Sequence, residues 1–463
     1  MKPYFPIIIA LALFLPSSGC KEKKIQKPLS DDYFQIRKKG EINVLTVAGS
    51  MSYFIYKGEP KGYEYELLND FAESCKLKIN IKLAENESKL VEMLLKNEGD
   101  LIAYNIPITK ENKASLFYCG REVTNQQVLI QRTGKGETQL KDVTDLIGKD
   151  VWVIHDSKYQ RRMKNLNDEL GGGINIRVID KDTISAEDLI EMVAMGKIPY
   201  TVSDADIAKL NKTYYPNINI SLQVSHPQRA SWAVRKTSPF LAAILNDWFK
   251  ENQNDSHYKS IVKRYFEMSK RPNDSQMAMA IVMGPHQISP FDHFFKEYAK
   301  QIQWDWRLLA AISFQESKFC TNCVSWAGAT GLMGLMPKTA EAFGLPSDQL
   351  DDPEGSVMAA TGFLKRLNRS FSEIQNENER IKFILAAYNA GAGHIYDAQA
   401  LAEKYGKDPH LWEEVEEYVR LKSLPEYYND PVCKQGYFRG TETINYVRNV
   451  VDRWNQYQEI VKH

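Results

Sequence analysis

The sequence predicts a multidomain protein in which a two-lobed α/β domain precedes a mainly helical α+β domain. The chain has 463 residues, more than one hydrophobic core of ordinary size accommodates. Strand-like and helix-like stretches alternate over residues 41–267, as they do in an α/β sheet. Over residues 288–463 helical periodicity dominates instead. Residues 268–287 carry Pro272, Gly284 and Pro285, and we interpret them as the linker between the domains.

The alternation within the first domain can be followed segment by segment. Residues 41–48 alternate in the manner of a strand, and residues 63–75 are typical of a helix. Residues 77–83 alternate again, and residues 88–95 are helical. A second lobe is expected to begin near Asp145, where a turn leads into the strand-like run D-V-W-V-I-H.

The overall composition is typical of a folded protein and argues against one class of partner. Hydrophobic residues make up 43% of the chain and charged residues 25%, with 59 basic side chains against 59 acidic ones. This balance leaves no surplus of positive charge to hold a polyanion. We therefore exclude nucleic acid as a partner.

Residues 1–20 are predicted to be a lipoprotein signal peptide. Lys2 precedes an apolar run over residues 7–15, which is too short to span a bilayer and leads into P-S-S-G-C. The small residues before Cys20 resemble a bacterial lipobox, although Ser17 stands where an aliphatic residue is usual. The resemblance implies that Cys20 carries a lipid and that polar residues 21–40 form a tether. The expected location is the periplasmic face of a Gram-negative outer membrane; the alternative is an ordinary cleaved signal.

Short sequence marks in the first domain occur in a characteristic order. They are G-Y-E-Y-E at residues 62–66, G-D-L-I-A at residues 99–103, the pair Ile108 and Thr109, and then Leu146, Gly148, Lys149 and Val151. Their order resembles family 3 of the bacterial extracellular solute-binding proteins over about residues 41–267. The resemblance implies a two-lobed domain that closes around a ligand.

The ligand-binding positions of that family are only half matched. The family uses an arginine shortly after the Ile-Thr pair for a ligand α-carboxylate, and an aspartate in the second lobe for the α-ammonium group. Here these positions correspond to Asn112 and Asp204. A neutral amide cannot replace the charged fork of an arginine. We therefore expect a muropeptide or amino-acid-like ligand that needs no free α-carboxylate, or a domain that binds no small molecule and serves as a spacer.

A candidate general acid lies in the second domain. Asp305 is a plausible N-cap for a helix that runs to about Lys318, and Leu308, Ile312 and Glu316 follow one another on its apolar stripe. A carboxylate on a buried helix face loses hydration, which raises its pKa. Glu316 is thus expected to act as an acid.

Several sequence blocks accompany Glu316 and Ser317. They are S-W-A-G-A at residues 325–329, G-L-M at residues 331–333, M-P at residues 336–337, A-Y-N-A-G-A-G at residues 387–393 and E-T-I-N-Y-V at residues 442–447. Together they resemble the family 1 lytic transglycosylases, whose domain is related to goose-type lysozyme, over about residues 288–460. One departure is Gly334, where the family often has Gln.

The resemblance implies a reaction and a set of site residues. Glu316 would protonate the glycosidic oxygen of peptidoglycan and then deprotonate the muramic acid C6 hydroxyl, giving a 1,6-anhydro product. A hydrolytic muramidase using the same glutamate is the nearest alternative, and a non-enzymatic envelope sensor that holds glycan is another. The order of the two domains resembles the F type of membrane-bound lytic transglycosylases. The residues implied to bind the glycan are Ser317, Ser325, Gly331, Met333, Tyr388, Asn389, Glu442 and Tyr446.

The cysteines give no support for a metal or cofactor. Cys75, Cys119 and Cys433 stand alone in the sequence, while Cys320 and Cys323 have C-x-x-C spacing. That spacing fits a zinc half-site or a redox pair, but neither a second C-x-x-C nor a histidine pair completes a metal site. We therefore favour a structural role for the pair and predict no cofactor.

Overall fold

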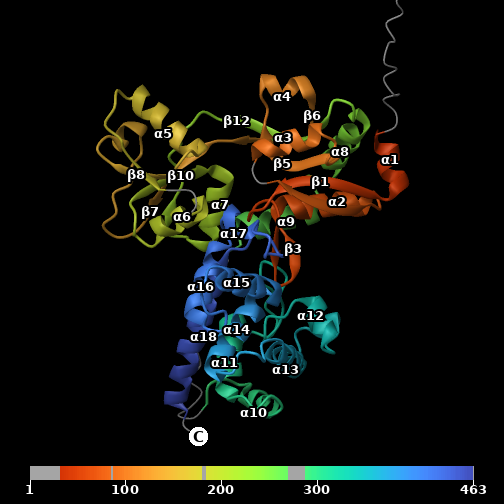
Figure 1. The fold of residues 1–463 in the computed structure, drawn as a ribbon, viewed down its shortest axis with the longest axis vertical. Coiled ribbons are helices and arrows are strands. Elements are labelled where there is room, and N and C mark those ends of the chain that lie inside the picture. Colours follow the sequence, from red (N-terminus) through yellow and green to blue (C-terminus); the bar gives the residue numbers. More distant parts are fainter. Residues whose placement is uncertain (1–31, 85–86, 180–183, 269–286, 462–463) are drawn as a thin grey trace, which may run out of the picture.

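The computed structural model describes residues 32–84, 87–179, 184–268 and 287–461, and it places two α/β lobes beside each other above a helical domain (Figure 1). The predicted fold class is confirmed. Lobe 1 holds a five-stranded sheet of order β4-β1-β5-β12-β6, in which β12 runs antiparallel to both neighbours. The strands are β1 (Glu41–Val47), β4 (Lys78–Ala84), β5 (Leu101–Pro107), β6 (Leu116–Asn125) and β12 (Gln228–Arg235).

Helices cover both faces of the sheet of lobe 1. Leu67 and Phe71 of α2 share a buried cluster with Leu245 of α8, while Leu90 of α3 packs against Leu45 in a second cluster. The sheet is therefore shielded from water on both sides, as expected for largely parallel strands. The helices of this lobe are α2 (Tyr63–Ser74), α3 (Glu87–Leu95), α4 (Lys110–Ser115), α8 (Pro239–Asn252) and α9 (Ser256–Phe266).

Lobe 2 has the same plan around a sheet of order β11-β7-β10-β8-β9. The chain passes from lobe 1 to lobe 2 after β6 and returns to lobe 1 before β12. These two connecting segments lie side by side, since the Gln127 N–H donates a hydrogen bond to Ser225 Oγ at 2.7 Å. Lobe 2 begins with β7, so the predicted start near Asp145 was wrong, because β7 follows β6 without a turn signal. The elements are β7 (Gln127–Arg132), β8 (Asp150–Ile154), β9 (Asn175–Ile179), β10 (Tyr200–Asp204), β11 (Ile218–Asn219), α5 (Lys158–Glu169), α6 (Ala186–Ala194) and α7 (Ala205–Tyr214).

Part of the predicted tether is a folded helix. Ile36 of α1 (Asp32–Lys39) is buried against lobe 1, and Asp32 accepts a hydrogen bond from the Leu241 N–H at 3.3 Å. The prediction of a tether over residues 21–40 was wrong for α1, because one buried isoleucine among polar residues gives a weak pattern. Residues 1–20 with Cys20, and nearly all of the predicted linker 268–287, lie outside the described residues. Within the described ranges no helix is both long and apolar enough to cross a membrane.

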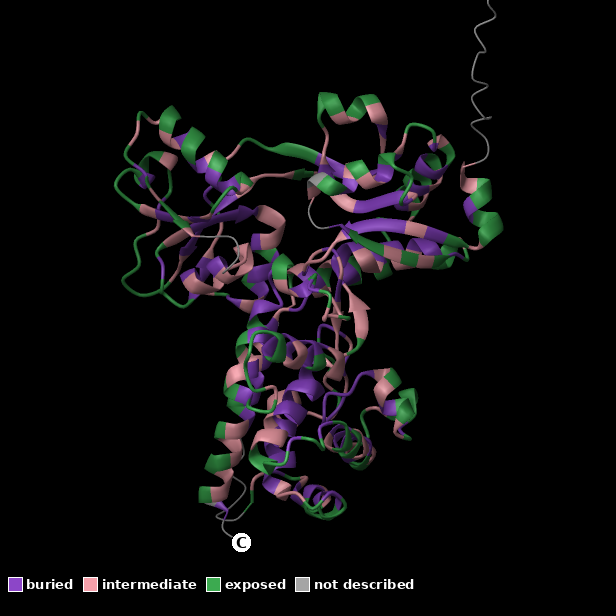
Figure 2. Ribbon diagram, viewed as in Figure 1, coloured by how far each residue is buried: buried purple, intermediate pink, exposed green. Residues whose placement is uncertain are grey.

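The C-terminal domain is a bundle in which α11 (Trp306–Ser317) packs on α18 (Gly440–Ile460), and α18 packs on α14 (Glu377–Ala390). Ile381, Ile384, Leu385 and Tyr388 on α14 have the spacing of one helix face and are all buried. Figure 2 shows buried residues on the inner sides of these helices and exposed residues on their outer sides. The other helices are α10 (Asp292–Lys300), α12 (Pro337–Ala342), α13 (Pro353–Ser370), α15 (Ala392–Lys404), α16 (Trp412–Leu421) and α17 (Pro425–Tyr428).

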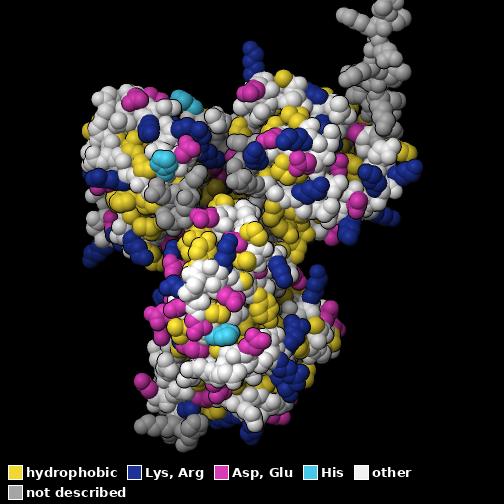
Figure 3. All heavy atoms as spheres, viewed as in Figure 1, with side chains coloured by type: hydrophobic (Ala, Val, Ile, Leu, Met, Phe, Trp, Pro, Cys, Tyr) yellow, Lys and Arg dark blue, Asp and Glu magenta, His cyan; other side chains and the backbone are white. Residues whose placement is uncertain are grey.

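A β-hairpin of lobe 1 joins the two domains. It consists of β2 (Phe54–Tyr56) and β3 (Glu59–Lys61) and extends from lobe 1 into the helical domain (Figure 1). Phe54 shares a buried cluster with Trp326 and Tyr437 of the C-terminal domain, and the rings of Tyr56 and Trp326 lie 5.3 Å apart. Figure 3 shows hydrophobic side chains gathered where the lobes meet the helical domain. The hydrophobic core of lobe 1 thus continues into the C-terminal domain.

Candidate active site

Glu316 lies in the last turn of α11, on its buried side. α11 begins after the predicted N-cap Asp305, whose side chain accepts a hydrogen bond from the second helical N–H at 3.0 Å, and it ends at Ser317 with Lys318 as its C-cap. Leu308 and Ile312 on the same stripe are fully buried, and the Glu316 side chain is only 9% exposed. The helix therefore presents one nearly dehydrated carboxyl group at its end.

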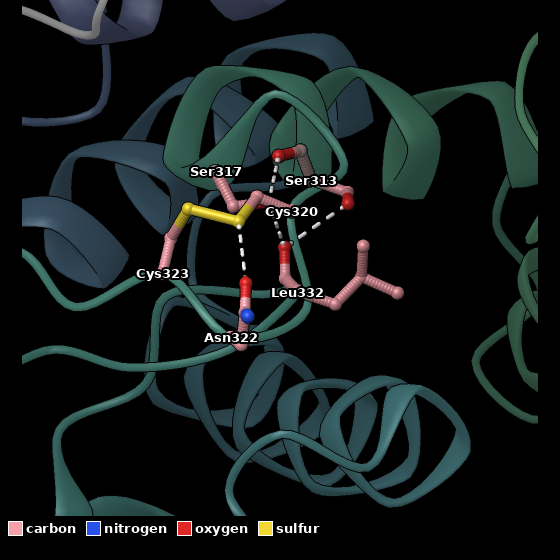
Figure 4. The surroundings of a disulfide bond; sticks show 6 residues. All are labelled: Ser313, Ser317, Cys320, Asn322, Cys323 and Leu332. Carbon is pink, nitrogen blue, oxygen red and sulfur yellow. Dashed lines mark hydrogen bonds between the residues drawn. A yellow bond between two sulfur atoms is a disulfide. The ribbon is translucent and has the colours of Figure 1, made fainter. Parts of the chain in front are cut away.

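The G-L-M block forms a tight turn against this helix. The hydroxyls of Ser313 and Ser317 donate to the carbonyl of Leu332 at 3.1 and 2.7 Å (Figure 4). Met333 is fully buried, and a Cβ at Gly331 would lie 2.1 Å from the Leu350 carbonyl oxygen. Ser317, Gly331 and Met333 thus fix the turn by packing and hydrogen bonding. None of these three residues faces an open surface while the hairpin is in place, and their contacts with the glycan stay a prediction.

Gly334 brings the backbone directly against the carboxyl group. Its φ is 59°, and a Cβ at this position would lie 2.4 Å from Glu316 Oε2. The departure from the more usual Gln therefore has a steric reason, since a side chain here would collide with Glu316 as it is placed.

Two of the predicted tyrosines lie close to Glu316. Tyr388 donates its hydroxyl hydrogen to the carbonyl of Met333 at 2.8 Å. Burial, and next the charge of Glu316, raise the pKa of Tyr388 and of Tyr446 well above their usual range. Both phenols therefore stay protonated, and Tyr446, unlike Tyr388, has its hydroxyl hydrogen available for the carboxyl group.

Asn389 and Glu442 line an adjoining pocket. Asn389 accepts a hydrogen bond from the Thr443 hydroxyl at 2.6 Å, which ties α14 to α18. Tyr56 and Trp326 line the same pocket, so Glu442 faces a different part of the cleft from the G-L-M turn. The structure thus brings Tyr388 and Tyr446 to Glu316, and places Asn389 with Glu442 next to them.

The tip of the hairpin occupies the cleft. Lys57 Nζ lies 3.1 Å from Glu316 Oε2 and donates to the Gly334 carbonyl at 3.2 Å. The Lys57 and Glu316 side chains are 8% and 9% exposed, so water barely reaches the ion pair. Lys57 also lies 5.8 Å from the centre of the Tyr388 ring. Sequence reasoning missed Lys57, because no local pattern relates it to a partner 259 residues away.

A buried histidine holds the hairpin on the C-terminal domain. His394 Nε2 lies 3.2 Å from the carbonyl oxygen of Ile55, and its Nδ1 lies 3.3 Å from Lys422 Nζ. Burial, and next the charge of Lys422, lower the pKa of His394 to about 3. The ring is therefore neutral near pH 7, so that Nε2–H donates to Ile55 while Nδ1 accepts from Lys422.

Comparison with known proteins identifies both domains. The model of the bacterial extracellular solute-binding proteins, family 3, matches residues 42–268, and that of the transglycosylase SLT domain matches residues 293–411. A membrane-bound lytic murein transglycosylase F from Desulfosudis oleivorans is 31% identical over 93% of this chain and 91% of that protein. One from Pseudomonas fluorescens is 30% identical over 96% and 89%. The chain belongs to the membrane-bound lytic murein transglycosylase F family.

Solved structures also match about half of this family member. A mutant of ArgBP from T. maritima is 22% identical, covers 51% of this chain and 99% of that chain, and has a TM-score of 0.41. An ancestral cationic amino acid solute-binding protein is 19% identical, covers 50% and 99%, and has a TM-score of 0.44.

A disulfide closes the loop that follows the glutamate helix in this transglycosylase F chain. Cys320 is bonded to Cys323, as Figure 4 shows, which fits the structural role that we favoured. Just beyond it, Ser325 Oγ accepts a hydrogen bond from the Ala329 N–H at 3.0 Å, so Ser325 shapes the loop that carries Trp326 to the hairpin. Among the described side chains no group of three or more Asp, Glu, His or Cys residues could hold a metal ion.

The cleft between the two lobes contains Asp204 but is not lined by Asn112. The Asn112 side chain donates to the Pro107 carbonyl at 3.4 Å. Asp204 directly precedes α7, and its Oδ2 lies 2.6 Å from Lys158 Nζ. The expected partner of a ligand ammonium group is thus already paired with a lysine of this chain. Sequence reasoning missed Lys158, because it lies at the start of a different helix, α5.

Proposed function

We propose that this chain cleaves the MurNAc-β-1,4-GlcNAc bond of peptidoglycan without water, leaving a 1,6-anhydroMurNAc end, with Glu316 as the single general acid and base. The observation that carries the proposal is the position of Glu316, a nearly dehydrated carboxyl group between the G-L-M turn and two tyrosine hydroxyls. Such shielding suits proton transfer to and from a sugar oxygen. Glu442 lines a separate pocket with Asn389, and we assign both to orienting the glycan.

The proposed reaction needs one carboxyl group and no co-reactant. Glu316 donates its proton to the leaving GlcNAc oxygen as the C1–O bond of MurNAc breaks. The resulting carboxylate accepts the proton of the MurNAc C6 hydroxyl, whose oxygen forms the new bond to C1. Glu316 ends protonated, ready for another cycle. The protonated phenol of Tyr446 stabilises the carboxylate between the two steps by hydrogen bonding, while Tyr388 holds the G-L-M turn through the Met333 carbonyl.

The experiment compares purified full-length chain with its Glu316→Gln variant on isolated sacculi. The variant keeps the size of the side chain but cannot transfer the proton, so cleavage should fall by a factor on the order of 10² to 10⁴. Glu442→Gln is the matched control, since an orienting residue should affect KM more than kcat. Full activity of a folded Glu316→Gln variant would exclude Glu316 as the acid.

Mass analysis of the products separates the proposed reaction from its alternatives. Anhydro products are lighter by one water than hydrolysis products. A digest that contains only reducing ends would assign a muramidase, which uses water in place of the C6 hydroxyl. Binding of sacculi without any cleavage would assign a non-enzymatic sensor.

We also propose that the first domain regulates cleavage and that the lipid on Cys20 holds the enzyme at the periplasmic face of the outer membrane. The Lys57–Glu316 ion pair supports regulation, because Glu316 has to leave this pair before it can protonate a sugar. A muropeptide or amino-acid-like ligand in the cleft between the lobes would favour an arrangement with the hairpin withdrawn. Such coupling typically amounts to about 5- to 150-fold. Equal cleavage rates with and without muropeptides would reduce the first domain to a spacer.

A further inference from the structure

The cavity between the lobes is lined by four acidic side chains and by the basic side chains of Lys158, Arg161 and Arg162, of which Arg162 is paired with Glu169 outside this acidic group. It has a volume of about 640 Å³. That volume is in the range of sites for small organic ligands. Four acidic residues from both lobes line it: Glu64, Glu87, Asp204 and Asp206.

Two of these acidic residues already have a cation. Lys158 Nζ lies 2.6 Å from Asp204 Oδ2 and 3.8 Å from Glu87 Oε2. The Tyr159 hydroxyl is a further partner of Asp204, at 3.3 Å. Lys158 belongs to lobe 2 and Glu87 to lobe 1, so the lysine bridges the lobes. Its ammonium group therefore takes the place beside Asp204 that the family resemblance reserves for a ligand.

Glu64 has no such cation. It lies in the first turn of α2 and is only 4% exposed. Its Oε2 has no hydrogen-bond partner among the described residues, although the residue lines the cavity. Burial, and next the charge of Asp206, raise the pKa of Glu64 well above its usual range. A buried carboxyl oxygen without a partner is costly, which marks this position as one that a ligand group completes.

Asp206 supplies a second acidic group on the lobe 2 side of the same cavity. Its carboxylate accepts hydrogen bonds from the Ile207 N–H at 2.7 Å and from the Asn125 side chain at 3.3 Å. These donors are uncharged, and the nearby cation Lys158 is itself paired with Asp204. Burial, and next the charge of Asp204, raise its pKa. A cation between Glu64 and Asp206 would relieve both effects and would bridge the two lobes.

We propose that Glu64 and Asp206 form a binding site for a primary ammonium group of the regulatory ligand, while Lys158 stays paired with Asp204. The site recognises an amine-bearing peptide through that ammonium group, which is the feature that Glu64 and Asp206 share as carboxyl groups of the same cavity. This proposal depends on the proposed function in one respect only, namely that the first domain binds a ligand. It differs from the expectation that Asp204 binds the amine.

Calorimetric titration of the full-length, detergent-solubilised chain tests the site. The probe is N-acetyl-L-Ala-γ-D-Glu-L-Lys, which has one free side-chain amine, and its matched control is the same peptide acetylated at that amine. The free-amine peptide should bind, and acetylation of the amine should abolish binding. Absence of binding by the free-amine peptide, or equal binding of both peptides, would overturn the proposal.

Variants then locate the amine within the cleft. Glu64→Gln is nearly isosteric and should weaken binding by about 30-fold or more, as expected when one partner of a buried charge pair is removed. Asp204→Asn should weaken it less, and an unchanged melting temperature shows that each variant is folded. If Asp204→Asn abolishes binding while Glu64→Gln binds fully, the ammonium group binds Asp204 and the proposal is refuted. These titrations do not involve cleavage, so their results stand apart from the test of Glu316.

Discussion

Replacing Lys57 by methionine should activate the enzyme. Methionine keeps the length of the side chain and its contacts with the hairpin surroundings, but removes the ammonium group that lies 3.1 Å from Glu316. The hairpin would then cover a carboxylate that has neither water nor a cation opposite it. The state with the hairpin in the cleft therefore becomes less stable than the state with the hairpin withdrawn.

The size of the effect follows from the burial of the pair. Breaking a buried ion pair by removing one partner costs about 3–5 kcal/mol. Protonation of Glu316 recovers part of this cost, while the Tyr56–Trp326 contact and the His394–Ile55 hydrogen bond continue to hold the hairpin. We therefore expect the free-energy difference between the two states to shift by about 1.5–3 kcal/mol toward the state with the hairpin withdrawn. This corresponds to roughly 10- to 10²-fold more of that state. Cleavage should rise by up to that factor.

The assay is the initial rate of release of muropeptides from sacculi, measured without added ligand. Lys61→Met is the matched control: it removes a lysine from the same hairpin, but one that lies 3.5 Å from Glu59 and not in the cleft. This control should keep the rate of the unmodified chain. A Lys57→Met rate equal to or below that of the control, in a chain with normal melting behaviour, would refute the hairpin as a brake.

Further predictions concern the anchor, the disulfide and the buried histidine. Cys20→Ser should move the protein from the membrane fraction to the soluble periplasm, and membrane retention after a high-salt wash would argue against a lipid. The Cys320–Cys323 disulfide closes a four-residue loop, so replacing both cysteines by serine should cost about 2 kcal/mol of unfolding free energy. Reductant should lower the melting temperature of the unmodified chain and not that of the variant; equal lowering in both would contradict this. Burial and Lys422 lower the pKa of His394 to about 3, below its unfolded value of about 6.5. Its contribution to stability is therefore present above about pH 6.5 and is lost as the pH falls toward 3. His394→Gln should flatten that fall in melting temperature, and an unchanged pH dependence would contradict the assignment.

The sequence by itself determined the elements that local patterns encode. Ile381, Ile384, Leu385 and Tyr388 are spaced for one face of a helix, and that face is buried in the structure. Asp305 was recognisable as an N-cap because a cap bonds to the backbone two or three residues away. The alternation of strands and helices likewise predicted the α/β class of the first domain. In each case the interacting groups are neighbours in the chain, so their spacing alone carries the information.

Only the tertiary structure decided which distant side chains meet. The Lys57–Glu316 pair joins two domains, and the Lys158–Asp204 pair joins α5 to the start of α7, so neither has a local signature. The same holds for Met333, whose place in the G-L-M block suggested a sugar contact although the side chain is fully buried. Partners far apart in sequence are selected by how whole elements pack, and packing depends on all the surfaces in contact at once. The sequence pattern therefore identified Glu316 as the candidate acid, whereas only the folded structure revealed that Lys57 covers it.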